Sequence, residues 1–262
     1  MPCRQFFHVD AFTSEPFRGN PAAVVVLKEW LPDTLLQQFA SEFFLPETAF
    51  VVPLDAGNKF HLRWFTPDLE MDLCGHATLA TAHILCNELN YGTGKLLFQT
   101  ASGELSVEQR GDLLWLDFPS RPGQPAICPP EIETGIGDVF GEVLLARDYM
   151  LIFDNEGMIQ NLHPDQTLLS QLNLGQGGII ATAPGNKVDF VSRFFTPGAT
   201  IFEDPVTGSA HCTLIPYWSK RLGKREMTAR QLSSRGGDIS CINLDRRVGI
   251  GGKAVTVFRG TF

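Results

Sequence analysis

The chain has 262 residues, of which 44% are apolar and 19% are charged, and this composition is typical of a globular protein with one large or two moderate hydrophobic cores. Its formal net charge is −8. This charge argues against nucleic acid or an anionic membrane surface as a main partner, because phosphate groups are bound by clustered Lys and Arg. No apolar run reaches the roughly 18 residues that predict a membrane-spanning helix.

The first residues lack the apolar core of a secretory signal peptide, so we expect a cytoplasmic protein. Its cysteines have no spacing that is typical of a zinc site, and we predict reduced thiols rather than disulfides. These cysteines are Cys3, Cys74, Cys86, Cys128, Cys212 and Cys241.

The first half of the chain is predicted to form strands and two helices. One helix is predicted to begin at Pro32–Asp33, where apolar residues recur at helical spacing. A second is predicted over Gly75–Leu89, and its apolar or small residues cover most of the circumference, which predicts burial on all sides. A turn is predicted at Asp55–Asn58. Strands are predicted at residues 6–12, 22–27, 49–53, 59–65, 96–100, 105–109 and 113–118.

The second half is again rich in predicted strands. Pro119–Gly137 contains several prolines and glycines and reads as a linker between domains 1–118 and 119–262. Helices are predicted at Pro164–Leu172 and from Gly208 to Leu222, where Pro216 predicts a kink or break. Strands are predicted at residues 143–145, 149–153, 178–183, 188–195, 229–233, 239–243, 247–251 and 254–258. An alternative for the last predicted strand is that it returns to the first domain and completes it.

One ordered pattern occurs twice, about half the chain apart. Arg63 and Arg193 each open an Arg-aromatic-Phe-Thr-Pro segment. Each segment continues through acidic residues to a small turn, Cys74–Ala77 or Thr207–Ala210, and then to a predicted helix. The ordered pair predicts a duplicated unit with a central helix in each copy.

The two turns are candidate binding sites for a carboxylate. The first N–H groups of a helix have no partner within the helix and carry partial positive charge, so they bind anions without Lys or Arg. If the two halves face each other, both helix starts open on one interdomain cleft. The alternative is that Gly75 and Gly208 only begin helices.

Three side chains near these turns are candidates for proton transfer. The helix dipole disfavours a protonated imidazole at His76, which predicts a neutral, proton-shuttling ring. Asp204 is expected to pair with His76 or, alternatively, to cap its own helix. Glu47 lies among phenylalanines, and a carboxylate in apolar surroundings is destabilised as an anion, which suits general acid–base catalysis. The alternative is an exposed loop residue.

Cys74 is a weaker candidate. A helix N-terminus lowers the pKa of a thiol, but the residue at the matching position of the second turn is Thr207, so a pair of catalytic thiols is absent. The chain also lacks the GxGxxG, Walker A, HExxH and GxSxG motifs, and we therefore predict no nucleotide cofactor and no metal.

Four segments resemble the phenazine-biosynthesis PhzF-like family, in the same order along the chain: Phe17–Ala22, Glu47–Phe50, Cys74–Thr78 and Glu203–Ala210. The resemblance implies the α+β fold of diaminopimelate epimerase, with two pseudo-symmetric domains that each wrap a β-sheet around a central helix. It also implies a cofactor-independent isomerase that forms a homodimer.

The resemblance implies roles for matching positions. Glu47 matches the general acid–base residue, His76 and Asp204 match further catalytic residues, and Ser209 matches a polar residue around the substrate. Gly75 and Gly208 match the backbone positions that hold its carboxylate. We also expect Asn20 and Thr207 to contact the substrate.

The resulting hypothesis is an isomerase that shifts a proton in a small carboxylic acid, with Glu47 as the general acid–base in the interdomain cleft. One alternative is an amino-acid epimerase or racemase that uses Cys74. A second alternative is a non-catalytic protein that binds a small acid on an inherited enzyme scaffold.

Overall fold

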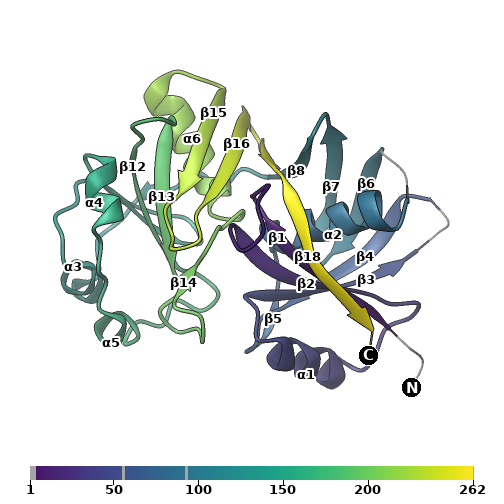
Figure 1. The fold of residues 1–262 in the computed structure, drawn as a ribbon. Helices are drawn as coiled ribbons and strands as arrows, with labels where there is room; N and C mark the ends of the chain where they lie inside the picture. The colour runs from purple at the N-terminus through teal and green to yellow at the C-terminus, as the bar shows by residue number, and fades with distance from the viewer. Residues whose placement is uncertain (1–3, 55–56, 92–93, 262) are drawn as a thin grey trace. The chain divides into compact units, whose positions relative to one another are not determined.

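The computed structural model describes residues 4–54, 57–91 and 94–261 and forms two compact units (Figure 1). Unit 1 comprises Met1–Phe118 and Gly249–Phe262, and unit 2 comprises Pro119–Val248. The end of the chain clusters with unit 1 because β18 (Ala254–Thr261) pairs antiparallel with β1 (Gln5–Ala11). Unit 2 is therefore shorter than the predicted domain 119–262. Cys3 and part of the turn predicted at 55–58 lie outside the described residues.

Unit 1 is a strand-rich layer around one central helix. Besides β1 and β18, its elements are β2 (Asn20–Val26), α1 (Asp33–Phe43), β3 (Glu47–Pro53), β4 (Lys59–Phe65), β5 (Glu70–Met71), α2 (Gly75–His83), the π-helical turn η1 (Ile84–Glu88), β6 (Lys95–Thr100), β7 (Gly103–Arg110) and β8 (Leu113–Pro119). β2 pairs parallel with β3, β3 antiparallel with β4, β4 parallel with β6, and β6 antiparallel with β7.

The central helix α2 is buried from Gly75 to Ala82, as the sequence predicted. The helix predicted to continue to Leu89 ends in a π-turn, in which the Leu89 N–H donates to the Ile84 carbonyl, five residues earlier, over 3.0 Å. α1 packs on the sheet through its apolar face, which includes Leu36 and Ala40.

A glycine fixes the start of β2. Gly19 has φ +63°, and a Cβ atom there would lie 2.1 Å from the carbonyl oxygen of Ala11. Any other residue would therefore clash with the β1 backbone. This close approach places Asn20, the first residue of β2, inside the sheet, where it is fully buried.

Unit 2 repeats the pairing scheme of unit 1. Its elements are β9 (Gln124–Pro125), α3 (Pro130–Ile136), β10 (Val143–Leu145), β11 (Tyr149–Ile152), α4 (Glu156–Gln160), α5 (Gln166–Leu169), β12 (Ile179–Pro184), β13 (Phe190–Phe195), β14 (Glu203–Asp204), α6 (His211–Leu222), β15 (Glu226–Gln231) and β16 (Gly237–Leu244). β11 pairs parallel with β12, β12 antiparallel with β13, β13 parallel with β15, and β15 antiparallel with β16. β17 (Arg247–Gly252) carries the chain from unit 2 into unit 1.

The sequence predictions for unit 2 need five corrections. The predicted linker contains the helix α3, which begins with Pro130 at a position where the missing N–H costs nothing. The predicted helix Pro164–Leu172 is one turn, Gln166–Leu169, and α4 was not predicted. α6 begins at His211 rather than Gly208, because the N–H groups of residues 211–213 bond to carbonyls three residues earlier, which forms a tighter turn. α6 also continues through Pro216 without a break.

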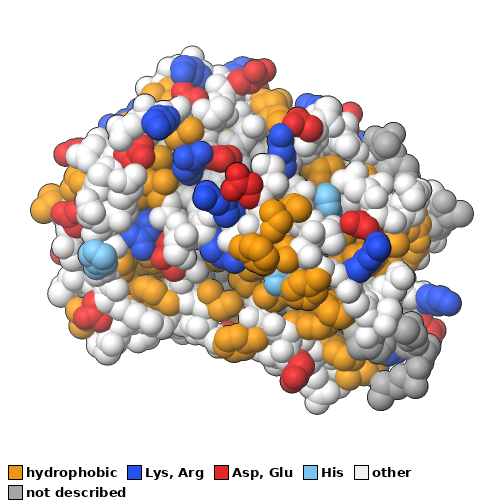
Figure 2. Space-filling view, viewed as in Figure 1, with side chains coloured by type: hydrophobic (Ala, Val, Ile, Leu, Met, Phe, Trp, Pro, Cys, Tyr) orange, Lys and Arg blue, Asp and Glu red, His pale blue; other side chains and the backbone are white. Residues whose placement is uncertain are grey.

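Positive and negative side chains are interspersed on the face seen in Figure 2. In the described ranges no helix is long and apolar enough to cross a membrane.

Candidate functional site

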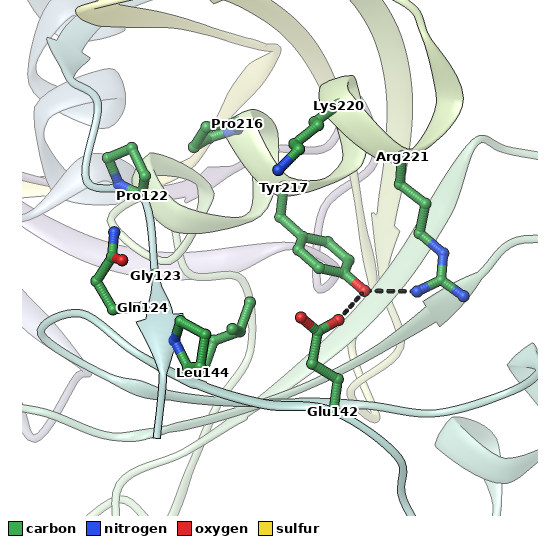
Figure 3. Close-up of a pocket in the computed structure, with 10 residues that line it drawn as sticks. Pro122, Gly123, Gln124, Glu142, Leu144, Pro216, Tyr217, Lys220 and Arg221 are labelled. Atoms are coloured by element: carbon green, nitrogen blue, oxygen red, sulfur yellow. Dashed lines mark hydrogen bonds between the residues drawn. The ribbon is translucent and has the colours of Figure 1, made fainter.

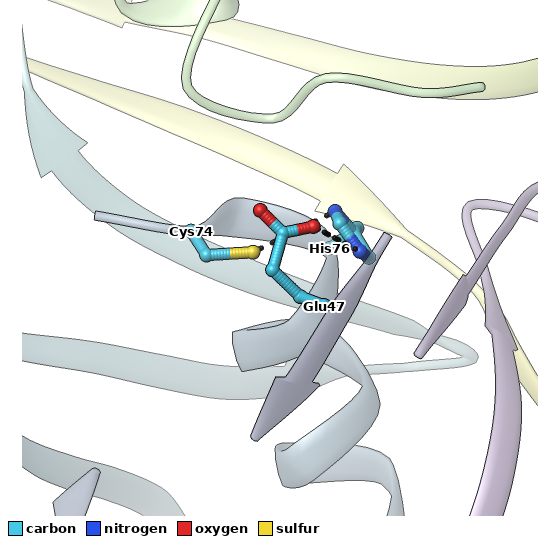
Figure 4. Close-up of side chains that lie close together, drawn as sticks. All are labelled: Glu47, Cys74 and His76. Carbon is cyan, nitrogen blue, oxygen red and sulfur yellow. Dashed lines mark hydrogen bonds and ion pairs between the residues drawn. The ribbon is translucent and has the colours of Figure 1, made fainter. Parts of the chain in front are cut away.

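Three side chains of unit 1 converge where α2 begins (Figure 4). Glu47 is the first residue of β3, Cys74 precedes α2, and His76 is the second residue of α2. One ligating atom from each lies within 4.8 Å of the others. The convergence brings together a carboxylate, a thiol and an imidazole from segments that are distant in sequence.

Glu47 and His76 form a close pair. The Oε2 atom of Glu47 lies 3.1 Å from Nε2 of His76, and the two side chains are 13% and 3% exposed. Glu47 is therefore neither an exposed loop residue nor sealed in the core. A carboxylate that touches both an imidazole and the solvent boundary has access to a substrate and a route for its proton.

Asn20 holds the other edge of the His76 ring. Its Nδ2 lies 3.0 Å from Nδ1 of His76. Because β2 and β3 are parallel with Ala22 opposite Glu47, their first residues reach the same edge of the sheet. When the amide donates to Nδ1, the ring proton lies on Nε2, toward Glu47. Rotation of the amide presents its oxygen instead, so Asn20 suits both charge states of His76.

The charge state of His76 differs from the one predicted. Burial favours the neutral ring, but Cys74 and Glu47 outweigh burial and raise the pKa of His76 above its ordinary value. The share from Cys74 requires a thiolate, whereas Glu47 acts through its carboxylate. The helix dipole alone predicted a neutral His76, whereas Cys74 and Glu47 together raise its pKa.

Cys74 is not an activated thiol. Its Sγ lies 3.6 Å from Nδ1 of His76, yet burial and the charge of Glu47 raise the pKa of Cys74 to about 11. The sequence predicted a lowered value from the helix N-terminus. Desolvation is the larger effect here because the side chain is almost completely buried.

Unit 2 gathers the remaining predicted site residues at its own turn. Thr207, Gly208 and Ser209 are buried, and Asp204 is partly buried. The Thr207 hydroxyl donates to Oδ2 of Asp204 over 2.5 Å. Asp204 does not cap α6, whose N-cap residue Ala210 has no side-chain cap hydrogen bond. The predicted pairing of Asp204 with His76 stays a prediction.

Two buried residues that the sequence did not single out hold this turn. Gln231, at the end of β15, accepts from the Thr207 N–H over 2.8 Å and donates to the Asp204 carbonyl over 2.7 Å. His211 Nδ1 lies 2.9 Å from the Thr207 carbonyl, and burial lowers the pKa of His211 to about 4. Neither residue belongs to a motif, and only the fold brings Gln231 next to the turn.

A third residue that the sequence did not single out, Arg147, places a positive charge beside this turn. Nη2 of Arg147 donates to Oγ of Ser209 over 3.1 Å, and its Nε lies 3.4 Å from Oδ1 of the buried Asp148. The sequence predicted that an anion would be held here without Lys or Arg. Arg147 precedes β11 and is remote in sequence from the turn, so no local pattern indicated a positive charge here, and how an anion is held stays a prediction.

A separate hollow of about 540 Å³ lies on unit 2 beside α6 (Figure 3). Three of its polar groups are bound to one another, since Tyr217 donates to Glu142 over 3.0 Å and accepts from Arg221 over 2.6 Å. Its lining residues are Pro122, Gly123, Gln124, Pro125, Glu142, Leu144, Pro216, Tyr217, Lys220 and Arg221. They include none of the predicted site residues.

Comparison with known proteins places the chain in a family. The profile of the family described as phenazine biosynthesis-like protein matches residues 9–134 and 144–260. An uncharacterized isomerase of Pseudomonas aeruginosa is 47% identical over 255 residues, which cover 97% of each chain. The crystal structure of a PhzF-family protein from Enterococcus faecalis has a TM-score of 0.93 and 45% identity, covering 99% of both chains.

A more distant likeness concerns the fold alone. The crystal structure of a probable proline racemase from Agrobacterium radiobacter has a TM-score of 0.66 at 9% identity, covering 98% of this chain and 92% of that chain. The chain thus has the epimerase-like α+β fold and belongs to the phenazine biosynthesis-like, or PhzF, family of proteins.

Proposed function

We propose that this protein is a cofactor-independent isomerase that moves a proton between carbons of a small, cyclic, hydroxylated carboxylic acid. The observation that supports the proposal most strongly is the 3.1 Å contact between Glu47 and His76. A carboxylate and an imidazole at this distance share a proton, which is what a group that removes and returns a proton requires.

Glu47 acts as the general acid–base. It removes a proton from one carbon and returns it at another, while His76 holds the carboxylate in position and stabilises its charge. Asn20 orients the His76 ring. Burial around His76 keeps bulk water from the pair, so the proton stays available for return to the substrate.

The epimerase alternative, with Cys74 as the base, has less support. A thiol whose pKa is about 11 is protonated at neutral pH and does not accept a proton from carbon. Its Sγ lies 3.6 Å from Nδ1 of His76, whereas Glu47 faces Nε2. The non-catalytic alternative also has less support, because a binding protein has no need of a buried carboxylate–imidazole pair.

Unit 2 supplies anion recognition in this proposal. The Gly208 turn, Ser209 and Arg147 together offer donors to a carboxylate. Asp204 is a candidate for positioning the substrate. Formation of a homodimer stays a prediction from the family resemblance.

An NMR screen in D₂O tests the proposal. Small cyclic and amino carboxylic acids are incubated with the protein, and exchange of carbon-bound hydrogen is followed. We expect exchange in a cyclic hydroxy acid with the wild-type protein and none with Glu47→Gln. Exchange at Cα of an amino acid that survives Glu47→Gln but is lost in Cys74→Ser would overturn the proposal in favour of the epimerase.

A further inference from the structure

We propose that Glu47, Cys74 and His76 form a binding site for a thiophilic divalent cation, Zn²⁺ or Cd²⁺, and that an occupied site blocks the enzyme. The cation-binding part stands on the geometry of the three side chains alone. The blocking part rests on the proposed function.

The spacing of the ligand atoms supports a shared cation. Zn–S bonds of about 2.3 Å and Zn–N bonds of about 2.0–2.1 Å place the sulfur and nitrogen of a tetrahedral site roughly 3.5 Å apart. Sγ of Cys74 lies 3.6 Å from Nδ1 of His76, and Oε2 of Glu47 lies 3.1 Å from Nε2. One cation takes one ring nitrogen, and one ligand atom from each of the three residues lies within 4.8 Å of the other two.

Coordination through Nε2 places the ring proton on Nδ1. The amide of Asn20, which lies 3.0 Å from Nδ1, then accepts this proton through its oxygen after rotation and orients the ring, as outer-shell partners of metal-bound histidines do. The three ligands stand on rigid elements, the start of β3 and the start of α2. A fourth position remains for water.

The donor set selects the kind of cation. One thiolate, one imidazole and one carboxylate suit Zn²⁺ and its heavier analogue Cd²⁺, whereas Mg²⁺ and Ca²⁺ prefer oxygen ligands alone. The charge also balances. The cation brings two positive charges, and two protons leave, one from the Cys74 thiol and one from the Glu47–His76 pair. The net charge of the buried site does not change.

Blocking follows from the identity of the ligands. Glu47 cannot take up a substrate proton while its oxygen is bound to a cation, and His76 loses the proton that it shares with Glu47. The bound cation thus inhibits the enzyme by competing with the protons of Glu47 and His76, and the enzyme is active without it.

Cadmium titration tests the site. The background protein carries Cys3→Ser and Cys128→Ser, which remove two other thiols, and binding is followed through the ultraviolet thiolate-to-cadmium charge-transfer band. We expect saturation at one Cd²⁺ per chain. Addition of Cys74→Ser should remove the band and weaken binding by at least the roughly 10–100-fold that loss of an outer-shell partner costs.

Two further variants locate the carboxylate ligand. Glu47→Gln in the same background should weaken Cd²⁺ binding, whereas Glu42→Gln, on the exposed side of α1, should not. Thermal unfolding controls for folding. Zn²⁺ should raise the midpoint of the background protein and not that of the Cys74→Ser protein, because only a ligand that binds the folded state stabilises it.

The outcomes separate the two proposals. An unchanged cadmium band in Cys74→Ser, or equal affinity in the Glu47→Gln and Glu42→Gln proteins, overturns the metal site. Inhibition of proton exchange by Zn²⁺ that a chelator reverses supports the blocking role, and undiminished exchange with the site saturated overturns it. Cadmium binding without exchange of any acid would leave the site standing and count against the proposed isomerase.

Discussion

The turn before α2 and the turn before α6 have similar hydrogen bonds to the backbone, but their side chains differ in chemistry. In each, the carbonyl before the glycine faces a side-chain donor four residues later. Thr78 Oγ1 donates to the Cys74 carbonyl over 2.5 Å, and His211 Nδ1 lies 2.9 Å from the Thr207 carbonyl. The difference lies in the acidic partner.

In unit 1 the carboxylate of Glu47 faces the imidazole of His76, a group that can take up and release a proton. In unit 2 the carboxylate of Asp204 faces the Thr207 hydroxyl, which does not. The same backbone frame therefore carries a carboxylate–imidazole pair in one unit and a carboxylate–hydroxyl pair in the other.

The largest expected effect comes from a pair of variants that separates proposed proton transfer in unit 1 from proposed substrate binding in unit 2. Glu47→Gln should lower kcat by about 10²-fold or more, because it removes a general acid–base. Ser209→Ala should act mainly on KM, because it removes a donor to the bound acid. Steady-state kinetics on the acid found by the exchange screen measures both. A fall in kcat for Ser209→Ala as large as that for Glu47→Gln would break the comparison.

The two buried histidines should respond to pH in opposite directions. Burial lowers the pKa of His211 from 6.5 to about 4, so the unfolded chain binds a proton before the folded chain does. This contribution is present above pH 6.5 and is lost as the pH falls toward 4, by up to about 3 kcal/mol. The raised pKa of His76 contributes stability at low pH that is lost as the pH rises through its folded value.

Urea unfolding across this range measures the effect of His211. His211→Gln, which keeps a donor for the Thr207 carbonyl, should flatten the loss of stability below pH 6.5. An equally steep acid loss in that variant would show that other groups cause it.

The frame of the second turn depends on Gln231. Gln231→Ala should lower the free energy of unfolding by about 2–3 kcal/mol, because the buried N–H of Thr207 and the Asp204 carbonyl lose their partner. Gln171→Ala, at an exposed position, is the matched control and should change stability little. Chemical denaturation measures both, and equal effects would contradict the role of Gln231.

The repeated arginines offer a smaller and graded test. Arg193 makes two contacts with Glu203 and donates to the Leu162 carbonyl over 2.7 Å, and Arg63 makes two contacts with Glu70. Arg193→Gln should cost about 1.5–3 kcal/mol. Arg63→Gln should cost less than about 1 kcal/mol, because its acidic partners are more exposed. A larger loss for Arg63→Gln in urea unfolding would reverse this order.

The smallest expected effect on turnover is that of Cys74→Ser. The thiol is protonated at neutral pH, so its replacement by a hydroxyl should change kcat by no more than a few-fold. A loss as large as that of Glu47→Gln in the same assay would place the thiol in the reaction.

The sequence predicted the parts of the site that lie within motifs. The apolar surface around α2 predicted its burial, and the segments near Asn20, Glu47 and His76 each predicted a polar group at an element boundary. It did not predict which groups meet. Asn20 and Glu47 both reach His76, and parallel pairing of β2 and β3 brings these two first residues to one edge of the sheet.

Other contacts have no local signal. Gln231 and Arg147 reach the second turn only through the folding of β15 and β11, and a lone Gln or Arg in the sequence resembles any surface residue. The pKa values of Cys74 and His76 were predicted in the wrong direction because local sequence shows the helix N-terminus and hides burial and the charge of Glu47.

The fate of the transferred proton tests the central claim most directly. If Glu47 alone removes and returns the proton in a site shielded from water, some product formed in D₂O must contain no solvent deuterium, because the original proton returns before it exchanges. NMR and mass spectrometry of the product after a short reaction measure that fraction. A measurable fraction without deuterium, with no product from Glu47→Gln, is the predicted result. Product that always carries one solvent deuterium, formed equally well by Glu47→Gln, would contradict the account.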